Sequence, residues 1–138
     1  MIFDSNVLIA LIEGKGGPDY TRRIARLQAD YDVRINEIIF AEVSVHYASA
    51  ANLNEVLGAA GIECTHLTLE ECHRAGLAFA EYRRRGGERP AILPDFLIGA
   101  QAEIRGWPLV TRDRRGFASY FPQLEIIDPM GKTEDCND

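Results

Sequence analysis

Short apolar runs alternate along the chain with longer segments in which apolar residues recur every three or four positions. The short runs predict β-strands at 1–3, 33–36, 62–67, 109–111 and 125–127. The longer segments predict helices at 5–12, 20–31, 38–51, 52–60, 68–85 and 95–105. Strands that alternate with helices predict a single α/β domain, in which a mainly parallel sheet of four to five short strands is flanked by helices in three layers.

Capping and turn residues mark the expected ends of several helices. Thr68 and Glu71 have the spacing of a capping box, and Gly61 and Gly106 follow segments with helical spacing. In segment 38–51 the apolar residues are too dense for a solvated helix, so we expect one largely buried helix there. After a turn at 113–116, residues 117–120 predict a short helical turn.

The chain has the size and composition of one globular domain. Of its 138 residues, 46% are hydrophobic and 26% are charged. No repeat or linker divides the sequence. We therefore expect one domain over residues 1–130, followed by a polar, frayed tail over 131–138.

The sequence also argues against several classes of protein. Its apolar runs are far shorter than the roughly twenty residues that cross a bilayer, and no secretory signal pattern opens the chain. Three cysteines without a Cys-x-x-Cys pair do not indicate a disulfide framework. We therefore expect a cytoplasmic protein that makes no contact with a membrane.

The net charge is acidic. At −6, it does not provide the positive field with which proteins bind nucleic acid non-specifically through phosphates. The same acidic balance is compatible with a carboxylate cluster that takes up divalent cations, which supply positive charge once bound. Composition alone does not choose between these interpretations.

Two aspartates come just after predicted strands. Asp4 directly follows the first strand, and Asp113 follows strand 109–111 after one intervening residue. The functional crevice of an open α/β sheet lies outside the carboxyl ends of its strands. We therefore expect neighbouring strands to bring these two carboxylates close together.

Two further carboxylates have apolar neighbours in the sequence. Glu42 lies three or four positions from Ile38, Ile39 and Val45 on a predicted helix, and Asp95 precedes the largely apolar segment 96–100. A charge on an apolar face costs free energy unless it is paired or bound to a metal. Both positions are therefore candidates for a functional site.

Each of the four acids also has an ordinary structural explanation. Asp4 and Asp95 can be helix N-caps, Asp113 can be a turn residue paired with an arginine, and Glu42 can be half of an ion pair. The functional interpretation depends on the four together. Carboxylates gathered from distant segments repel one another, and hard divalent cations relieve that repulsion.

The segments that carry these acids resemble those of PIN-domain ribonucleases, in the family's order and over nearly the whole chain. They are 3–9 (FDSNVLI), 40–43 (FAEV), 95–100 (DFLIGA) and 111–113 (TRD). In its small size and single-domain layout, the chain is similar to the VapC-type toxins of bacterial toxin–antitoxin pairs.

The resemblance implies a metal-dependent endoribonuclease. By that resemblance, the catalytic residues that bind Mg²⁺ or Mn²⁺ are Asp4, Glu42, Asp95 and Asp113. Ser5, Asn6 and Thr111 would support them through hydrogen bonds. The resemblance also implies an RNA substrate, a cognate antitoxin and a homodimer, for which the helices around 53–57 and 69–82 are candidate contacts.

Local rather than overall positive charge would hold the RNA. The candidate RNA-binding residues flank Asp113 and are Arg112, Arg114 and Arg115. A second basic cluster precedes Asp95 and consists of Arg83, Arg84, Arg85 and Arg89. Such a run is also typical of a solvated helix end.

Other functions stay open on the sequence alone. A PIN ribonuclease of RNA processing or decay needs no antitoxin, and a PIN-like RNA-binding or interaction module needs no catalysis. An aspartyl phosphatase is disfavoured because it needs a second aspartate where Asn6 stands, and no dinucleotide-binding glycine motif follows the first strand. A zinc site is disfavoured because no common zinc module has the spacing of Cys64, His66, Cys72 and His73.

Overall fold

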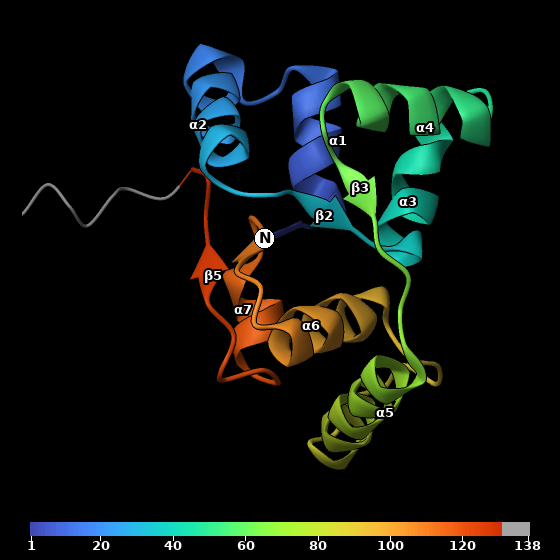
Figure 1. Ribbon diagram of the computed structural model, residues 1–138. Helices are drawn as coiled ribbons and strands as arrows, with labels where there is room; N and C mark the ends of the chain where they lie inside the picture. The colour runs from blue at the N-terminus through green and yellow to red at the C-terminus, as the bar shows by residue number, and fades with distance from the viewer. Residues whose placement is uncertain (131–138) are drawn as a thin grey trace, which may run out of the picture.

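Five short parallel strands form the centre of the computed structural model, which describes residues 1–130 (Figure 1). The strands are β1 (Ile2–Phe3), β2 (Arg34–Ile35), β3 (Glu63–Cys64), β4 (Leu109–Val110) and β5 (Ile126–Ile127). Their order in the sheet is β3-β2-β1-β4-β5, and each neighbouring pair is parallel. The predicted parallel α/β sheet is confirmed.

Helices cover both faces of this sheet. They are α1 (Ser5–Glu13), α2 (Gly17–Asp30), α3 (Glu37–Val43), α4 (Ala50–Ala59), α5 (Leu69–Arg84), α6 (Pro94–Arg105) and α7 (Arg114–Ala118). Figure 1 shows α1 to α4 on one side of the sheet and α5 to α7 on the other. The three-layer arrangement therefore agrees with the sequence prediction.

Apolar residues of the strands form the centre of the hydrophobic core. Ile2, Phe3, Ile35, Leu109 and Val110 are fully buried between the two helical layers, as expected for the strands of a parallel sheet. Burial of such side chains is the main favourable contribution to folding.

A second, smaller apolar cluster joins α5, α6 and the segment after α7. Its buried members are Ala75, Ala78, Phe96, Ala100 and Phe121. Gly99 permits the contact on the α6 side, because a Cβ atom at that position would lie 2.4 Å from the Phe121 ring. This cluster fixes α6, the helix whose first turn carries Asp95.

The prediction of one buried helix over 38–51 is wrong. Helix α3 ends at Val43, a 3₁₀ turn follows at Ser44–His46, and α4 begins only after Ser49. The Ser49 hydroxyl accepts a hydrogen bond from the backbone of Asn52 at 3.1 Å, so Ser49 caps α4 in an extended backbone conformation. Val45 is 80% exposed, so the dense apolar spacing did not mean burial.

The predicted helical turn at 117–120 is also displaced. Helix α7 spans Arg114–Ala118, because the Asp113 carboxylate caps it by accepting a hydrogen bond from the backbone of Gly116. A capping aspartate therefore set the start of this helix earlier than the apolar pattern indicated.

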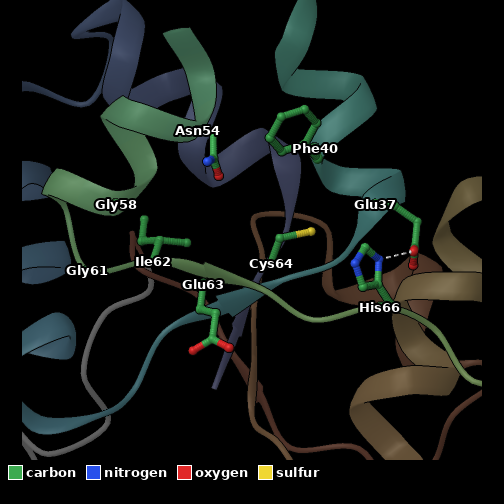
Figure 2. A pocket seen from close by; sticks show the side chains of 9 residues that line it. All are labelled: Glu37, Phe40, Asn54, Gly58, Gly61, Ile62, Glu63, Cys64 and His66. Atoms are coloured by element: carbon green, nitrogen blue, oxygen red, sulfur yellow. Dashed lines mark hydrogen bonds and ion pairs between the residues drawn. The ribbon is translucent and has the colours of Figure 1, made fainter. Parts of the chain in front are cut away.

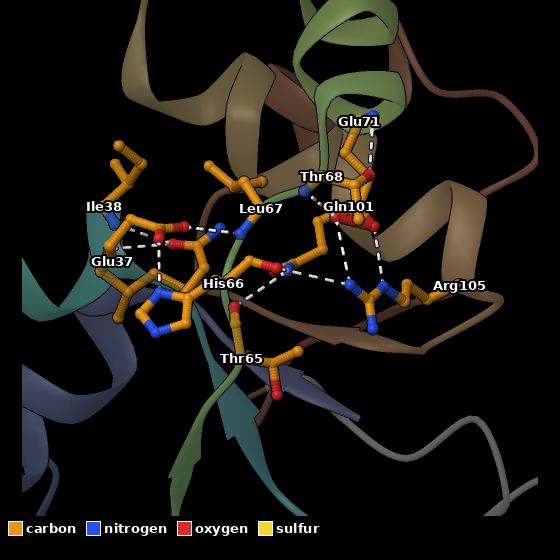
Figure 3. A network of polar contacts seen from close by, with 11 residues as sticks. Glu37, Ile38, Thr65, His66, Leu67, Thr68, Glu71, Gln101 and Arg105 are labelled. Atoms are coloured by element: carbon orange, nitrogen blue, oxygen red, sulfur yellow. Dashed lines mark hydrogen bonds and ion pairs between the residues drawn. The ribbon is translucent and has the colours of Figure 1, made fainter.

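A polar network ties α6 to the connection between β3 and α5 (Figure 3). The buried amide of Gln101 donates to the backbone oxygen of Thr65 at 3.0 Å. The guanidinium of Arg105 binds Glu71, whose side chain is 1% exposed, at 2.7 Å. Glu71 also completes the predicted capping box with Thr68. These contacts hold α6 along its length and so help to position Asp95 at its start.

Two further expectations from the sequence concern a membrane-spanning helix and the C-terminal tail. In the part of the chain that the structure describes, no helix is both long and apolar enough to cross a membrane. The tail predicted at 131–138 lies outside the described residues.

Candidate active site

Asp4 lies where the strand order of the sheet reverses. The chain leaves β1 toward β2 and β3 on one side, while β4 and β5 lie on the other, and such a switch point is the usual binding crevice of an open α/β sheet. Asp4 is only 4% exposed there. Its Oδ1 accepts a hydrogen bond from the backbone of Ser5 at 2.8 Å, and its Oδ2 accepts one from the Thr111 hydroxyl, also at 2.8 Å.

Asp4 therefore caps a helix and also accepts a hydrogen bond from a distant segment. Its bond from Ser5 caps α1, as the ordinary explanation expects. Its second oxygen is held by Thr111, which directly follows the neighbouring strand β4 and lies 107 positions away in the sequence. A cap alone does not require that second, buried contact.

Glu42 reaches the same region from α3. Its Oε1 accepts a hydrogen bond from the Ser5 hydroxyl at 3.1 Å, and the same hydroxyl lies 3.5 Å from Asp4 Oδ1. Among residues 1–130, Glu42 forms no ion pair, so the ordinary explanation is wrong for this residue. Ser5 instead joins the carboxylates of Asp4 and Glu42.

Asp95 lies in the first turn of α6 but does not cap it. Leu93 occupies the N-cap position, Pro94 begins the helix, and no side chain caps it. The Asp95 carboxylate is half-buried and accepts no hydrogen bond from any described residue. The N-cap explanation is therefore wrong for Asp95, and its burial needs another reason.

Asp113 follows β4 and is exposed. It caps α7 through Gly116 at 3.3 Å, and its own backbone N–H donates to the Thr111 hydroxyl at 3.1 Å. Within residues 1–130 it has no arginine partner, so only the turn part of its ordinary explanation holds. Thr111 thus contacts both the residue at the end of β1 and the residue after β4.

The four carboxylates lie close enough to affect one another electrostatically. Burial, and after it the negative charges of Asp4, Asp113 and Glu42, raises the pKa of Asp95 to about 6. Burial also raises the pKa of Asp4 and of Glu42 above their ordinary values, against hydrogen bonds that lower both. The fold has therefore gathered like charges from four separate segments, which costs free energy.

Asn6 completes the polar contacts around Thr111. Its amide Nδ2 donates to the Thr111 hydroxyl at 3.3 Å, and its Oδ1 accepts from the backbone of Arg112 at 3.3 Å. The three residues expected to support the acids, Ser5, Asn6 and Thr111, therefore all contact the acidic group or its immediate neighbours.

The donor chemistry of this group suits a hard divalent cation. All four side chains offer carboxylate oxygens, the ligands that Mg²⁺ and Mn²⁺ prefer, and their mutual repulsion is what such an ion relieves. Across residues 1–130, however, no three acidic, histidine or cysteine side chains are already arranged to hold a metal ion. Asp4, Glu42 and Asp113 instead accept hydrogen bonds from nearby serine, threonine or backbone groups.

A large cavity lies elsewhere, between α3, α4 and β3 (Figure 2). It has a volume of about 720 Å³, and its lining includes Glu37, Phe40, Cys64 and His66. A 2.7 Å contact joins His66 Nδ1 to Glu37, a pair that no sequence motif had indicated. Cys72 and His73 do not line this cavity, so the four residues of the disfavoured zinc hypothesis do not converge on it.

Comparison with known proteins identifies the domain. Residues 1–120 match the family model of the PIN domain. No curated protein sequence matches the chain.

Solved structures with a similar fold include chains of three bacterial complexes. For VapBC2 of Rickettsia felis bound to a promoter DNA fragment, the TM-score is 0.69 at 19% identity, covering 92% of this chain and 98% of that one. For DNA-bound VapBC of Salmonella typhimurium, the TM-score is 0.70 at 23% identity, covering 93% and 96%. For a toxin–antitoxin complex of Klebsiella pneumoniae, the TM-score is 0.66 at 21% identity, covering 95% and 98%. At these identities the likeness establishes the fold.

Proposed function

The chain belongs to the PIN-domain family, and from this premise we propose that it is a metal-dependent endoribonuclease, the toxin of a toxin–antitoxin pair. The observation that carries the proposal is the position of Asp95. Its half-buried carboxylate has no hydrogen-bond partner in residues 1–130 and is affected by the charges of Asp4, Asp113 and Glu42. A structural role explains neither its burial nor its neighbours.

We assign the metal to these four carboxylates. A bound Mg²⁺ or Mn²⁺ would activate water for attack on an RNA phosphodiester and offset the charge that develops on the phosphate. The assignment is supported by the all-oxygen donor set and its repulsion, not by a preformed arrangement around an ion.

The protein's own residues orient the carboxylates. Thr111 holds Asp4 Oδ2, and Ser5 holds the other oxygen of Asp4 together with Glu42. Asn6 donates to the Thr111 hydroxyl, which leaves that hydroxyl proton directed at Asp4. Partners of this kind fix the orientation of metal-binding carboxylates.

The antitoxin is proposed from the comparisons. The three similar chains come from a toxin–antitoxin complex and two VapBC complexes, which supports a protein partner of the same kind for this chain. A cytoplasmic location is part of the same proposal, as is a single domain over residues 1–130.

A homodimer remains part of the proposal, with α5 as its better contact. On α5, Leu69 is 89% exposed and Leu77 is 54% exposed, so both apolar side chains are available for contact with a second copy of the chain. On α4, Leu53 and Leu57 are buried within the chain itself, so only Val56 is available there.

The test is RNA cleavage by the purified chain. We expect cleavage with Mg²⁺ or Mn²⁺, none in EDTA, and none by the folded Asp4→Asn or Asp95→Asn variants. Sequencing RNA ends after expression of the active chain and of Asp4→Asn would identify the target. Cleavage without metal, or by both variants at the normal rate, would reject the mechanism.

Cleavage assays, together with growth on expression, separate the alternatives. A non-catalytic RNA-binding module would bind RNA without cleaving it under any metal condition. A processing enzyme without an antitoxin would cleave RNA, yet its expression would not arrest growth and no co-expressed neighbouring gene product would inhibit it.

A further inference from the structure

The arginines of this acidic protein fall into two groups. Most in residues 1–130 are held by carboxylates or backbone carbonyls. Those whose side chains form no ion pair and no hydrogen bond within this range are Arg26, Arg89, Arg112 and Arg115. All four are exposed. A guanidinium with no protein partner binds a phosphate without first breaking an ion pair.

Most of the basic run before Asp95 belongs to the held group. Arg83 donates to the carbonyls of Gly87 and Arg89, at 3.4 and 3.0 Å. Arg84 and Arg85 both pair with Glu81, and Arg85 also lies over the Tyr120 ring. These side chains stabilise the end of α5 and the loop after it.

Arg114 is likewise held by the protein. Its Nη2 donates to the backbone oxygen of Ile126 at 3.1 Å, which ties α7 to β5. Of the three arginines around Asp113, only Arg112 and Arg115 therefore extend free guanidinium groups into solvent. They stand on either side of an acid of the proposed active site.

Arg89 lies in the loop that leads into α6, whose first turn carries Asp95. Its backbone N–H donates to the Tyr82 hydroxyl at 3.4 Å, and the Tyr82 ring packs 5.7 Å from the ring of Phe96, the residue after Asp95. Arg83 holds its carbonyl oxygen. The backbone of Arg89 is thus linked through Tyr82 to Phe96 in the first turn of α6, while its side chain forms no hydrogen bond or ion pair within residues 1–130.

Arg26 provides a natural comparison. It is also free, but it lies in the second half of α2, which runs from the end of α1 back toward the start of β2. It lies four residues before the end of α2, close in the chain to the start of β2, and therefore toward the amino ends of the strands rather than the carboxyl ends that carry the acids.

We propose that Arg89 on one side, and Arg112 and Arg115 on the other, bind phosphates of an RNA strand on the two sides of the acidic site. This inference rests on the proposed ribonuclease function. With a net charge of −6, the chain has no overall attraction for RNA, so local positive charge must supply it, from unpaired guanidinium groups as well as from any bound cation.

The test measures binding rather than cleavage. A fluorescein-labelled single-stranded oligouridylate is titrated with the Asp95→Asn protein, at a fixed Mg²⁺ concentration and at several KCl concentrations. Loss of one phosphate contact on single-stranded RNA reduces the slope of log K against log salt by about 0.7. We expect this reduction, with weaker binding, for Arg89→Ala, Arg112→Ala and Arg115→Ala in that background.

Two matched controls define the result. Arg26→Ala removes a free arginine away from the site, and Arg84→Ala removes a paired one from the basic run that contains Arg89; both should leave the slope unchanged. Arg115→Lys should keep most of the slope, because it retains the charge. Equal slopes for Arg89→Ala and Arg84→Ala would overturn the inference.

The two proposals fail in different ways. Cleavage of RNA by the unmodified chain, with normal slopes in all three alanine variants, would reject the phosphate contacts and leave the ribonuclease intact. Absence of both cleavage and salt-dependent binding would reject the two together.

Discussion

The Thr111 hydroxyl donates to Asp4 Oδ2 at 2.8 Å, and this bond joins the carboxyl ends of β4 and β1. The Thr111 hydroxyl oxygen also accepts a hydrogen bond from the backbone N–H of Asp113 at 3.1 Å. The Thr111 side chain therefore orients Asp4, which follows β1, and the backbone of Asp113, which follows β4.

We predict that Thr111→Val reduces RNA cleavage about 10–100-fold, since loss of such an orienting bond typically has this cost. Thr111→Ser, which retains the hydroxyl, should keep most of the activity. The measurement is kcat/KM on a labelled RNA, with thermal melting as the control for folding. Full activity in a folded Thr111→Val protein would show that the bond is only structural.

The raised pKa of Asp95 makes stability depend on pH. Because the folded-state pKa of about 6 lies above the ordinary 3.8, this carboxyl contributes stability that is fully present below pH 3.8 and is lost as the pH rises through 6. In the absence of divalent cations, Asp95→Asn should therefore stabilise the protein at neutral pH.

We expect a gain of about 1–2 kcal/mol at neutral pH, after allowance for the partial exposure of this group. The gain should shrink on acidification below pH 6. Urea unfolding of both proteins across this pH range measures it. A variant that is less stable than the unmodified chain at neutral pH would contradict the attribution of the raised Asp95 pKa to burial and, after it, to repulsion by the other acids.

Divalent cations should offset the stability that is lost when the carboxylate of Asp95 is ionised. Mg²⁺ or Mn²⁺ bound to the carboxylates removes their repulsion, and a ligand at a hundred times its Kd stabilises the folded state by about 2.7 kcal/mol. We predict a higher Tm on addition of either ion, reversed by EDTA, and a much smaller rise for Asp95→Asn. An equal rise in both proteins would place the ion elsewhere.

The Glu71–Arg105 pair should contribute to stability away from the site. Glu71 is almost fully buried, while the Arg105 side chain is 29% exposed. Removing one partner leaves a buried charge, so Arg105→Met should cost about 2–3 kcal/mol, somewhat less than for a fully buried pair.

A double variant with Glu71→Gln should recover part of that loss, because the uncompensated charge is gone. Denaturant unfolding of the single and double variants forms the thermodynamic cycle. Additive losses would mean that the two side chains do not interact in solution, whatever their distance in the structure.

The helices show where sequence patterns succeed and fail. The capping box at Thr68 and the glycine after α6 marked their helices correctly, because local hydrogen bonds and a left-handed glycine at the end decide these positions. The break between α3 and α4 was missed, since the cap at Ser49 competed with a dense apolar pattern. The exposed Val45 shows that an apolar residue does not require burial.

The candidate site also has features that the sequence predicted and features that it could not predict. Apolar neighbours in the sequence drew attention to Glu42 and Asp95, and in the structure both carboxylates are partly buried with raised pKa values, because charge on an apolar face is costly. The sequence could not distinguish Arg89 from Arg83 or Arg112 from Arg114. Within 1–130 that difference depends on carbonyl groups supplied by a loop and by another strand.

The sequence by itself determined the alternation of strands and helices, the parallel sheet and the four acids in their order. These are local properties, since side-chain periodicity and capping depend on residues a few positions apart. Only the tertiary structure decided that Thr111 holds Asp4, that Ser5 joins Asp4 to Glu42, and that Asp95 is left without a partner in residues 1–130. Those features arise from contacts between distant segments, whose strength depends on burial and on distance in space rather than on spacing along the chain.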